Sequence, residues 1–187
     1  MPRLRLTLLG GFEVRSSSGP IAIPLRKAQA LLAYLALPPG QPHPRSKLAA
    51  LLWGDAGEEE ARNSLRQTLF GLRRALTVVR EPVLLTDGES VTLSASAVNV
   101  DVATFERLVR EGTTRALEEA AALYKGELVE GLNVPEAPLE DWLMGERQRL
   151  REEAVGALGK LLRDHLAAGK NDSAIRAALR LLTLEPL

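Results

Sequence analysis

The sequence predicts an α+β fold for the N-terminal half of the chain and an all-α fold for the C-terminal half. Apolar and polar residues alternate at residues 4–8, which is the two-residue period of a half-buried strand. Helical periodicity follows, and a strand-prone stretch at residues 82–93 then interrupts it. From Asp101 onward every segment favours a helix. The 187 residues, 45% hydrophobic and 26% charged, are enough for one large domain or two small ones.

The first element expected is a small antiparallel sheet. The alternation at residues 4–8 breaks at Gly10-Gly11 and resumes at residues 12–15. A turn rich in serine and glycine at residues 16–20 then leads to a third strand at residues 21–23.

Three helices and a hairpin follow this sheet. The helices are expected at residues 25–37, at residues 46–53 with Ser46 as N-cap, and at residues 58–77. Leucines of the third helix recur at steps of four, three and four, which predicts one buried stripe, at Leu65, Leu69, Leu72 and Leu76. Asp87-Gly88 separates two β-prone runs within residues 82–93 and therefore predicts a hairpin.

This order of elements, in residues 1–97, is typical of a winged helix-turn-helix domain. In such a domain the second helix braces the third, and the hairpin packs beside the third helix as a wing. The third helix then presents its polar face to a groove of double-stranded DNA.

The C-terminal half, residues 98–187, is expected to be tetratricopeptide-like and entirely helical, with the boundary within residues 96–100. Helices are predicted at residues 102–111 after a cap at Asp101, at 113–125, at 139–168, and from Asn171 or Asp172 onward. The spacing of a tetratricopeptide unit, a helical hairpin of roughly 34 residues, is matched at Leu158, Leu161, His165, Ala174, Leu181 and Pro186. Because the match stops where a further repeat would begin, we expect the chain to be the N-terminal piece of a longer protein.

The formal net charge of zero conceals an asymmetry along the chain. Residues 1–98 hold 12 basic and 8 acidic residues, whereas residues 99–187 hold 12 basic and 16 acidic residues. Within residues 26–80 there are nine basic groups and only four acidic ones. This local excess indicates either a solvated surface or an anionic partner.

The third helix carries the candidate functional residues. If its leucine stripe faces inward, the opposite side presents Asn63, Arg66 and Gln67, whose side chains can read guanine and adenine edges in the major groove. No acidic residue occurs between Arg62 and Leu76, which favours contact with DNA over a solvated face. Flanking or phosphate contacts are expected from Arg62, Ser64, Phe70, Arg73, Arg74, Arg45, Ser46, Lys47, Arg26, Lys27 and Thr86.

The sequence predicts no enzyme, no metal and no cofactor. It has no cysteine, no phosphate-binding glycine motif and no H-E-x-x-H or G-x-S-x-G motif. His43 and His165 are far apart in the sequence and are expected to be surface or packing residues, and Glu58–Glu60 are expected to offset a helix dipole. No apolar run is long enough to span a membrane and no signal peptide is recognisable, so a soluble, cytoplasmic protein is expected.

Several motifs, in order, resemble the Streptomyces antibiotic regulatory protein type of transcriptional activator. They are Leu8-Leu9-Gly10-Gly11-Phe12-Glu13-Val14, Lys47-Leu48 to Leu51-Leu52-Trp53, and Ala61-Arg62-Asn63-Ser64-Leu65-Arg66-Gln67 to Leu72-Arg73-Arg74-Ala75-Leu76. The second half resembles the bacterial transcriptional activator domain of that family at Asp101-Val102 to Phe105, Leu123 to Leu128 and Glu140-Asp141-Trp142-Leu143 to Glu146-Arg147.

The resemblance implies a transcriptional activator that binds direct repeats near promoters as a dimer or tandem pair and contacts RNA polymerase. Phe70 and Gly71 depart from the small polar and basic residues of the family, and Phe70 is expected either to contact a thymine methyl or to pack against the wing. The rival hypothesis is a protein-interaction module, in which the acidic helical half binds a partner and the winged half is a scaffold.

Overall fold

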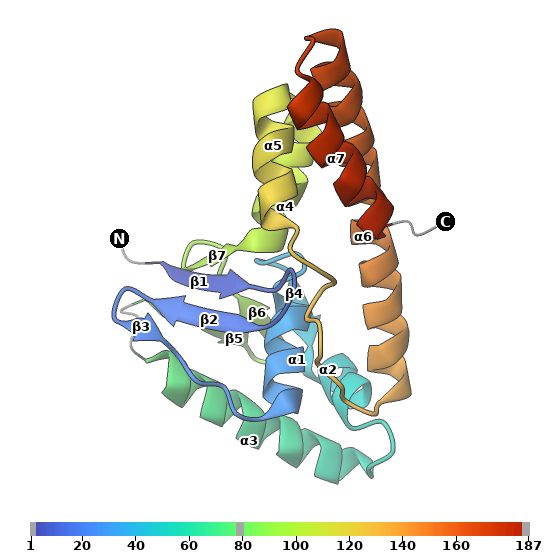
Figure 1. The fold of residues 1–187 in the computed structure, drawn as a ribbon. Helices are drawn as coiled ribbons and strands as arrows, with labels where there is room; N and C mark the ends of the chain where they lie inside the picture. The colour runs from blue at the N-terminus through green and yellow to red at the C-terminus, as the bar shows by residue number, and fades with distance from the viewer. Residues whose placement is uncertain (1–2, 78–80, 185–187) are drawn as a thin grey trace.

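The computed structural model of the chain describes residues 3–77 and 81–184, and Figure 1 shows how they are arranged. Two small sheets and three helices make up the lower part of the view, and four further helices rise above and beside them. The strands are β1 (Leu4–Thr7), β2 (Glu13–Ser16), β3 (Gly19–Pro20), β4 (Pro42–Pro44), β5 (Leu84–Asp87), β6 (Ser90–Leu93) and β7 (Val98–Val100). The helices are α1 (Arg26–Leu35), α2 (Arg45–Leu52), α3 (Glu58–Leu76), α4 (Asp101–Glu111), α5 (Thr114–Leu123), α6 (Ala137–Ala167) and α7 (Asn171–Leu184).

The first sheet has the strand order β3-β2-β1-β7, with β1 inside it. Strand β1 pairs antiparallel with β2, as expected. Buried Leu4 and Leu6 alternate along it with exposed Arg5, in the two-residue period of a strand with one face in the core. The third strand is Gly19–Pro20 and not residues 21–23. The prediction fails because the pairing with β2 begins directly at the turn, and only the amide of Ile21 continues it, donating to Val14 (2.8 Å).

Strand β7 was not predicted as a strand and lies beyond residue 97, the predicted end of the first domain. It pairs parallel with β1, with Leu4 opposite Val98. Its valines are buried and Asn99 between them is exposed, so three residues complete the N-terminal sheet. The sheet therefore ends at residue 100, inside the boundary region of residues 96–100.

The second sheet has the order β4-β6-β5 and contains the predicted hairpin. Strands β5 and β6 pair antiparallel with Asp87 opposite Ser90, so that Gly88 and Glu89 form the turn. Strand β4 lies in the proline-rich loop, where no strand was expected. It is an edge strand, and at an edge a proline need not interrupt the ladder of hydrogen bonds.

The three predicted helices of the N-terminal half are confirmed as α1, α2 and α3. The predicted leucine stripe of α3 is buried, and its members range from 1% to 3% exposed. Ser46 is not the N-cap of α2 as predicted, because the backbone of Pro44 is still extended and the helix begins at Arg45. Thr113 does cap α5, since its side chain accepts from the amide of Ala116 at 3.2 Å.

Asp101 is the first residue of α4 and not its N-cap, and its carboxylate also joins the two halves of the chain. The carboxylate oxygens accept from the amides of Leu8 and Leu9 at the end of β1 (2.9–3.0 Å) and from Val102 at 2.8 Å. Burial raises the pKa of Asp101, while these backbone hydrogen bonds act in the opposite direction.

Residues 98–187 were predicted to be entirely helical, and this is wrong for β7, whose residues 98–100 complete the N-terminal sheet. Residues 101–184 fold into the four helices α4 to α7, and in the connection between α5 and α6 Leu128 forms an isolated bridge with Leu9. Helix α6 runs upward beside both halves, and α7 returns along its upper part (Figure 1). The hairpin of α6 and α7 buries Leu158, Leu161, His165 and Ala174, four members of the predicted repeat spacing. Leu181 is half-buried, and Pro186 lies outside the described residues.

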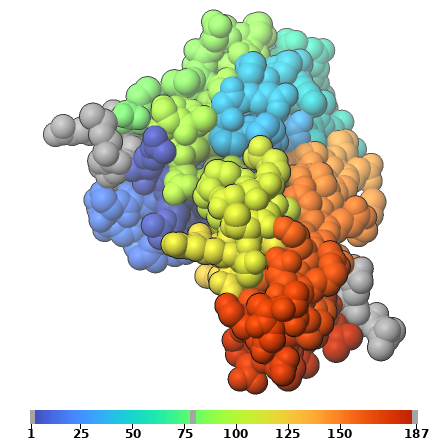
Figure 2. Space-filling model, turned by 90° about the horizontal axis from the view of Figure 1, so that it is seen from above, coloured from blue at the N-terminus to red at the C-terminus, as the bar shows by residue number. Residues whose placement is uncertain are grey.

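One hydrophobic core extends through both halves. The same cluster contains Leu6 of β1, Leu69 of α3, Phe105 of α4 and Leu150 of α6. Figure 2 shows α6 beside the segment that joins α1 to α2, and a hollow of about 310 Å³ lies among that segment, α4 and α6. Within the described ranges, no helix is both long and apolar enough to cross a lipid bilayer.

Candidate nucleic-acid interface

Helix α3 has one buried face and one exposed polar face. Three carboxylates, Glu58–Glu60, occupy its first turn, and two arginines occupy its last turn, so both ends carry charge that offsets the helix dipole. No carboxylate occurs among residues 61–76 of the helix. The middle of α3 is therefore the part of its exposed face that favours an anion.

The three predicted base-reading residues lie together on this exposed face. Asn63, Arg66 and Gln67 are all exposed. The guanidinium of Arg66 donates through Nη1 to Oδ1 of Asn63 at 3.1 Å, which holds the two side chains side by side. One of the five N–H donors of Arg66 is used in this bond, and the others remain for a ligand.

The flanking residues of α3 differ in their exposure and in whether they contact other side chains of the chain. Arg62 is paired with Glu58 (2.6 Å), four residues earlier, and both side chains are exposed. Ser64 is half-buried at the flank of the face, and Arg74 is exposed. Phe70 is 68% exposed, so it does not pack against the hairpin, and that alternative for this residue is wrong.

One hydrogen bond joins α3 to the hairpin. Nη2 of Arg73 donates to Oγ1 of Thr86 on β5 at 3.2 Å. Arg73 is half-buried, and Thr86 is exposed. The two residues predicted as phosphate contacts on helix and wing are thus brought together, next to a turn that carries the exposed carboxylates of Asp87 and Glu89.

The start of α2 lies close to both the hairpin and α3. The amide of Arg45 donates to the carbonyl of Glu89 at 2.8 Å, and Ser46 and Lys47 are exposed in the first turn. A hollow of about 260 Å³ lies between α2 and α3, and Ser46 and Arg62 both line it.

Arg26 and Lys27, predicted as phosphate contacts, both have partners in the segment that leads into α6. Arg26 donates from Nη1 to the carbonyl of Asn133 at 3.4 Å. Lys27 forms an ion pair with Glu136 at 2.6 Å. Sequence reasoning did not identify these partners because they lie more than 100 residues away and carry no motif. Arg80, a further basic residue of the predicted excess, lies outside the described residues.

Both histidines are packed inside the fold. His43 is buried on β4 against the ring of Tyr34, with ring centroids 5.0 Å apart. Burial, and next the positive charge of Lys47, lower the pKa of His43. His165 is buried between α6 and α5, 3.5 Å from Glu118. Residues 3–77 and 81–184 hold no group of three or more side chains suited to a metal ion.

Comparison with known proteins gives a family match for part of this chain and a similar fold among the solved structures. Residues 100–187 match the bacterial transcriptional activator domain. The whole chain is similar in fold to a structure described as Mycobacterium tuberculosis EmbR in complex with a low affinity phosphopeptide, with a TM-score of 0.83 and 21% identity. The chain spans 52% of the length of that protein. No match to the curated proteins is found.

Proposed function

We propose that this chain is a cytoplasmic, sequence-specific DNA-binding transcriptional regulator of the Streptomyces antibiotic regulatory protein type, and the match of residues 100–187 to the bacterial transcriptional activator domain supports this proposal. Its N-terminal residues, 1–97 together with β7, act as a winged helix-turn-helix domain. The following helices act as a tetratricopeptide-like domain. The protein is an activator and not an enzyme.

The observation that carries this proposal is the exposed middle of α3. Asn63, Arg66 and Gln67 have the donor and acceptor groups that recognise guanine and adenine edges. No aspartate or glutamate occurs among residues 61–76 of the helix that carries them. The three carboxylates of the first turn would repel DNA phosphates. We therefore infer that the middle of α3, and not its N-terminus, enters the major groove.

Phosphate contacts surround the base-reading residues on both sides. Arg74 on α3 and Lys47 on α2 are exposed cations, and the Arg73–Thr86 pair lies at the hairpin. Contacts of this kind supply affinity and position the helix, while base contacts select the sequence. Arg26 and Lys27 contribute less, because the chain already engages them.

The helical half supplies the contact that turns DNA binding into activation. Binding of two copies to direct repeats near a promoter, as a dimer or tandem pair, places this half beside RNA polymerase. These partners follow from the family resemblance and are part of the proposal.

The test is a selection of bound sequences from a random duplex library with the purified chain, followed by titration of the selected and a scrambled duplex at two salt concentrations. We expect an enriched site, and an affinity that falls steeply with salt. If the chain binds an enriched site with an affinity that does not change with salt concentration, the assignment of the phosphate contacts is wrong. Absence of binding at low salt would overturn the proposal and favour the rival function, a protein-interaction module with the winged half as scaffold.

A further inference from the structure

The carboxylate of Glu136 lies in the segment that leads into α6, yet it contacts the N-terminal half at two points. Its side chain is almost buried, with the residue 8% exposed. Oε1 forms an ion pair with Nζ of Lys27 on α1 at 2.6 Å. Oε2 accepts from the backbone amide of Gly54, directly after α2, at 3.2 Å. One side chain of the C-terminal half thus joins α1 to the turn between α2 and α3.

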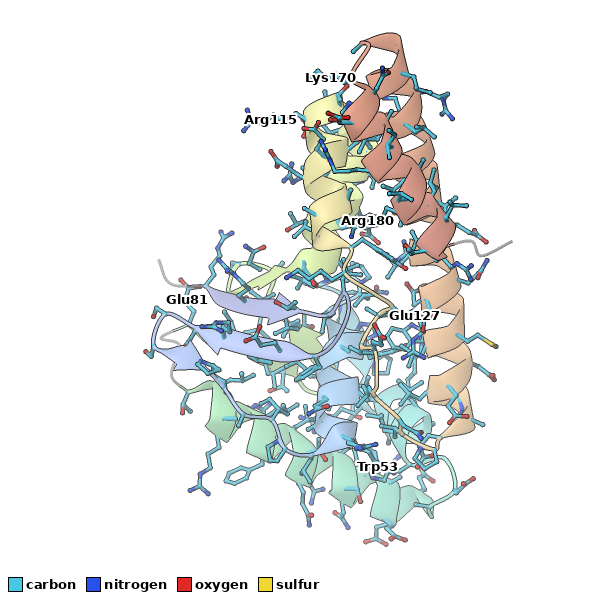
Figure 3. All side chains as sticks on the ribbon, viewed as in Figure 1. Trp53, Glu81, Arg115, Glu127, Lys170 and Arg180 are labelled. Atoms are coloured by element: carbon cyan, nitrogen blue, oxygen red, sulfur yellow. The ribbon has the colours of Figure 1, made fainter. Side chains whose placement is uncertain are left out.

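That turn is tightly built around this contact. Helix α2 ends at Trp53, whose backbone has left the helical region, and Gly54 follows. A Cβ atom on Gly54 would lie 3.0 Å from the carbonyl oxygen of Ala50, so the backbone passes close to the end of α2. The ammonium of Lys27 lies over the ring of Trp53, 5.2 Å from its centroid. In Figure 3, Trp53 lies at the lower end of α1, where these elements meet.

The neighbouring contacts keep Glu136 in a fixed position. The rings of Trp142 on α6 and Tyr34 on α1 meet edge to face, with centroids 4.8 Å apart. Arg26 binds the carbonyl of Asn133, three residues before Glu136. A buried carboxylate is costly unless its oxygens are paired. Since both oxygens of Glu136 have partners from different elements, the side chain holds those elements in one relative position.

We propose that Glu136 is a positioning residue for α3. By holding Gly54 and Lys27, it fixes the turn from which α3 starts, and so fixes the angle at which the base-reading side chains meet a duplex. This inference rests on the proposed DNA-binding function. It also assigns Lys27 a role inside the protein in place of a phosphate contact.

The test compares Glu136→Gln and Glu136→Ala with Glu140→Gln, a matched variant at an exposed carboxylate one helical turn later. Two quantities are measured in the full chain: the exchange rate of the Gly54 amide, and the affinity for the selected and the scrambled duplex. The thermal unfolding of each variant is recorded as well, so that a misfolded variant is recognised.

We expect Glu136→Ala to speed exchange of the Gly54 amide, and Glu136→Gln to weaken binding of the selected duplex by about two- to thirtyfold. Binding of the scrambled duplex should stay within about twofold, and Glu140→Gln should leave all quantities unchanged. Lys27→Gln added to Glu136→Gln should cost nothing more, because the pair is already broken.

Two results would overturn the proposal. One is unchanged exchange at Gly54 in Glu136→Ala. The other is an equal loss of affinity for both duplexes in Glu136→Gln. If the unaltered chain binds no duplex, the proposed function fails by itself, while the exchange rate of Gly54 still decides whether Glu136 holds the turn.

Discussion

Replacing Arg66 by alanine tests the proposed base readout most directly. The side chain is exposed on α3 and its guanidinium is held by Asn63 at 3.1 Å. The bond restrains the guanidinium in the free protein, so less conformational entropy is lost when the guanidinium forms bidentate hydrogen bonds with guanine. Removing the side chain removes that contact and leaves the fold unchanged, because the buried leucine stripe lies on the other face.

The expected loss follows from the energy of one such contact. A two-pronged arginine–guanine pair discriminates against the wrong base by about 1–3 kcal/mol, which corresponds to a 5- to 150-fold weaker affinity for the selected site. Arg62→Ala is the matched comparison, because Arg62 is exposed on the same helix but already paired with Glu58 at 2.6 Å. That variant should lose little affinity, and equally for every sequence.

The assay is equilibrium binding of both variants to the selected duplex, to its single-base variants and to a scrambled duplex. For Arg66→Ala, one position of the site should lose its base preference, while affinity for the scrambled duplex changes little. Equal losses on the selected and the scrambled duplex would refute the reasoning. Arg66 would then be a phosphate contact.

Three further predictions concern single side chains. Phe70, 68% exposed on α3, should contact a thymine methyl group of the bound site. Replacing that thymine by deoxyuridine should weaken binding of the unaltered chain by about 0.8 kcal/mol. The same replacement should leave the binding free energy of the Phe70→Ala variant unchanged. An equal cost in both proteins would contradict the contact. Burial lowers the pKa of His43, so the unfolded chain takes up its proton first and the free energy of unfolding should fall as the pH drops below about 6.5, by at most about 1.4 kcal/mol per pH unit. In urea titrations from pH 8 to 5, the stability difference between the unaltered chain and His43→Leu should bend near that pH, and a constant difference would refute the assignment. Asp101→Ala should lower the free energy of unfolding by about 1–3 kcal/mol, because the amides of Leu8 and Leu9 lose their acceptor. Asp141→Ala, an exposed carboxylate, should change it by less than about 0.5 kcal/mol, and similar losses in both variants would show that the Asp101 contact is unimportant.

Elements defined by local periodicity could be predicted from the sequence. Helix α3 and its buried stripe follow from the leucine spacing, and the β5–β6 hairpin follows from Asp87-Gly88. The exposed face with Asn63, Arg66 and Gln67 follows from the same spacing, because residues opposite a buried stripe must face outward.

Elements defined by distant partners could not be predicted. Strand β7 has only three residues, and its pairing with β1 depends on residues at the other end of the N-terminal half. Strand β4 contains two prolines, which argue against a strand unless it lies at an edge. The ion pair of Lys27 with Glu136 likewise arises from tertiary packing. A basic residue with no partner nearby in the sequence therefore has its charge balanced by a distant carboxylate in the fold.

The parallel pairing of β1 with β7 has a consequence for synthesis of the protein. The first strand to leave the ribosome needs Val98–Val100 beside it, so the nascent sheet stays incomplete until residue 100 has emerged. A fragment that stops at residue 97 would leave one side of β1 without a neighbour, and unpaired strand edges promote aggregation. An autonomous N-terminal fragment must therefore extend at least through Asp101, whose carboxylate binds the end of β1.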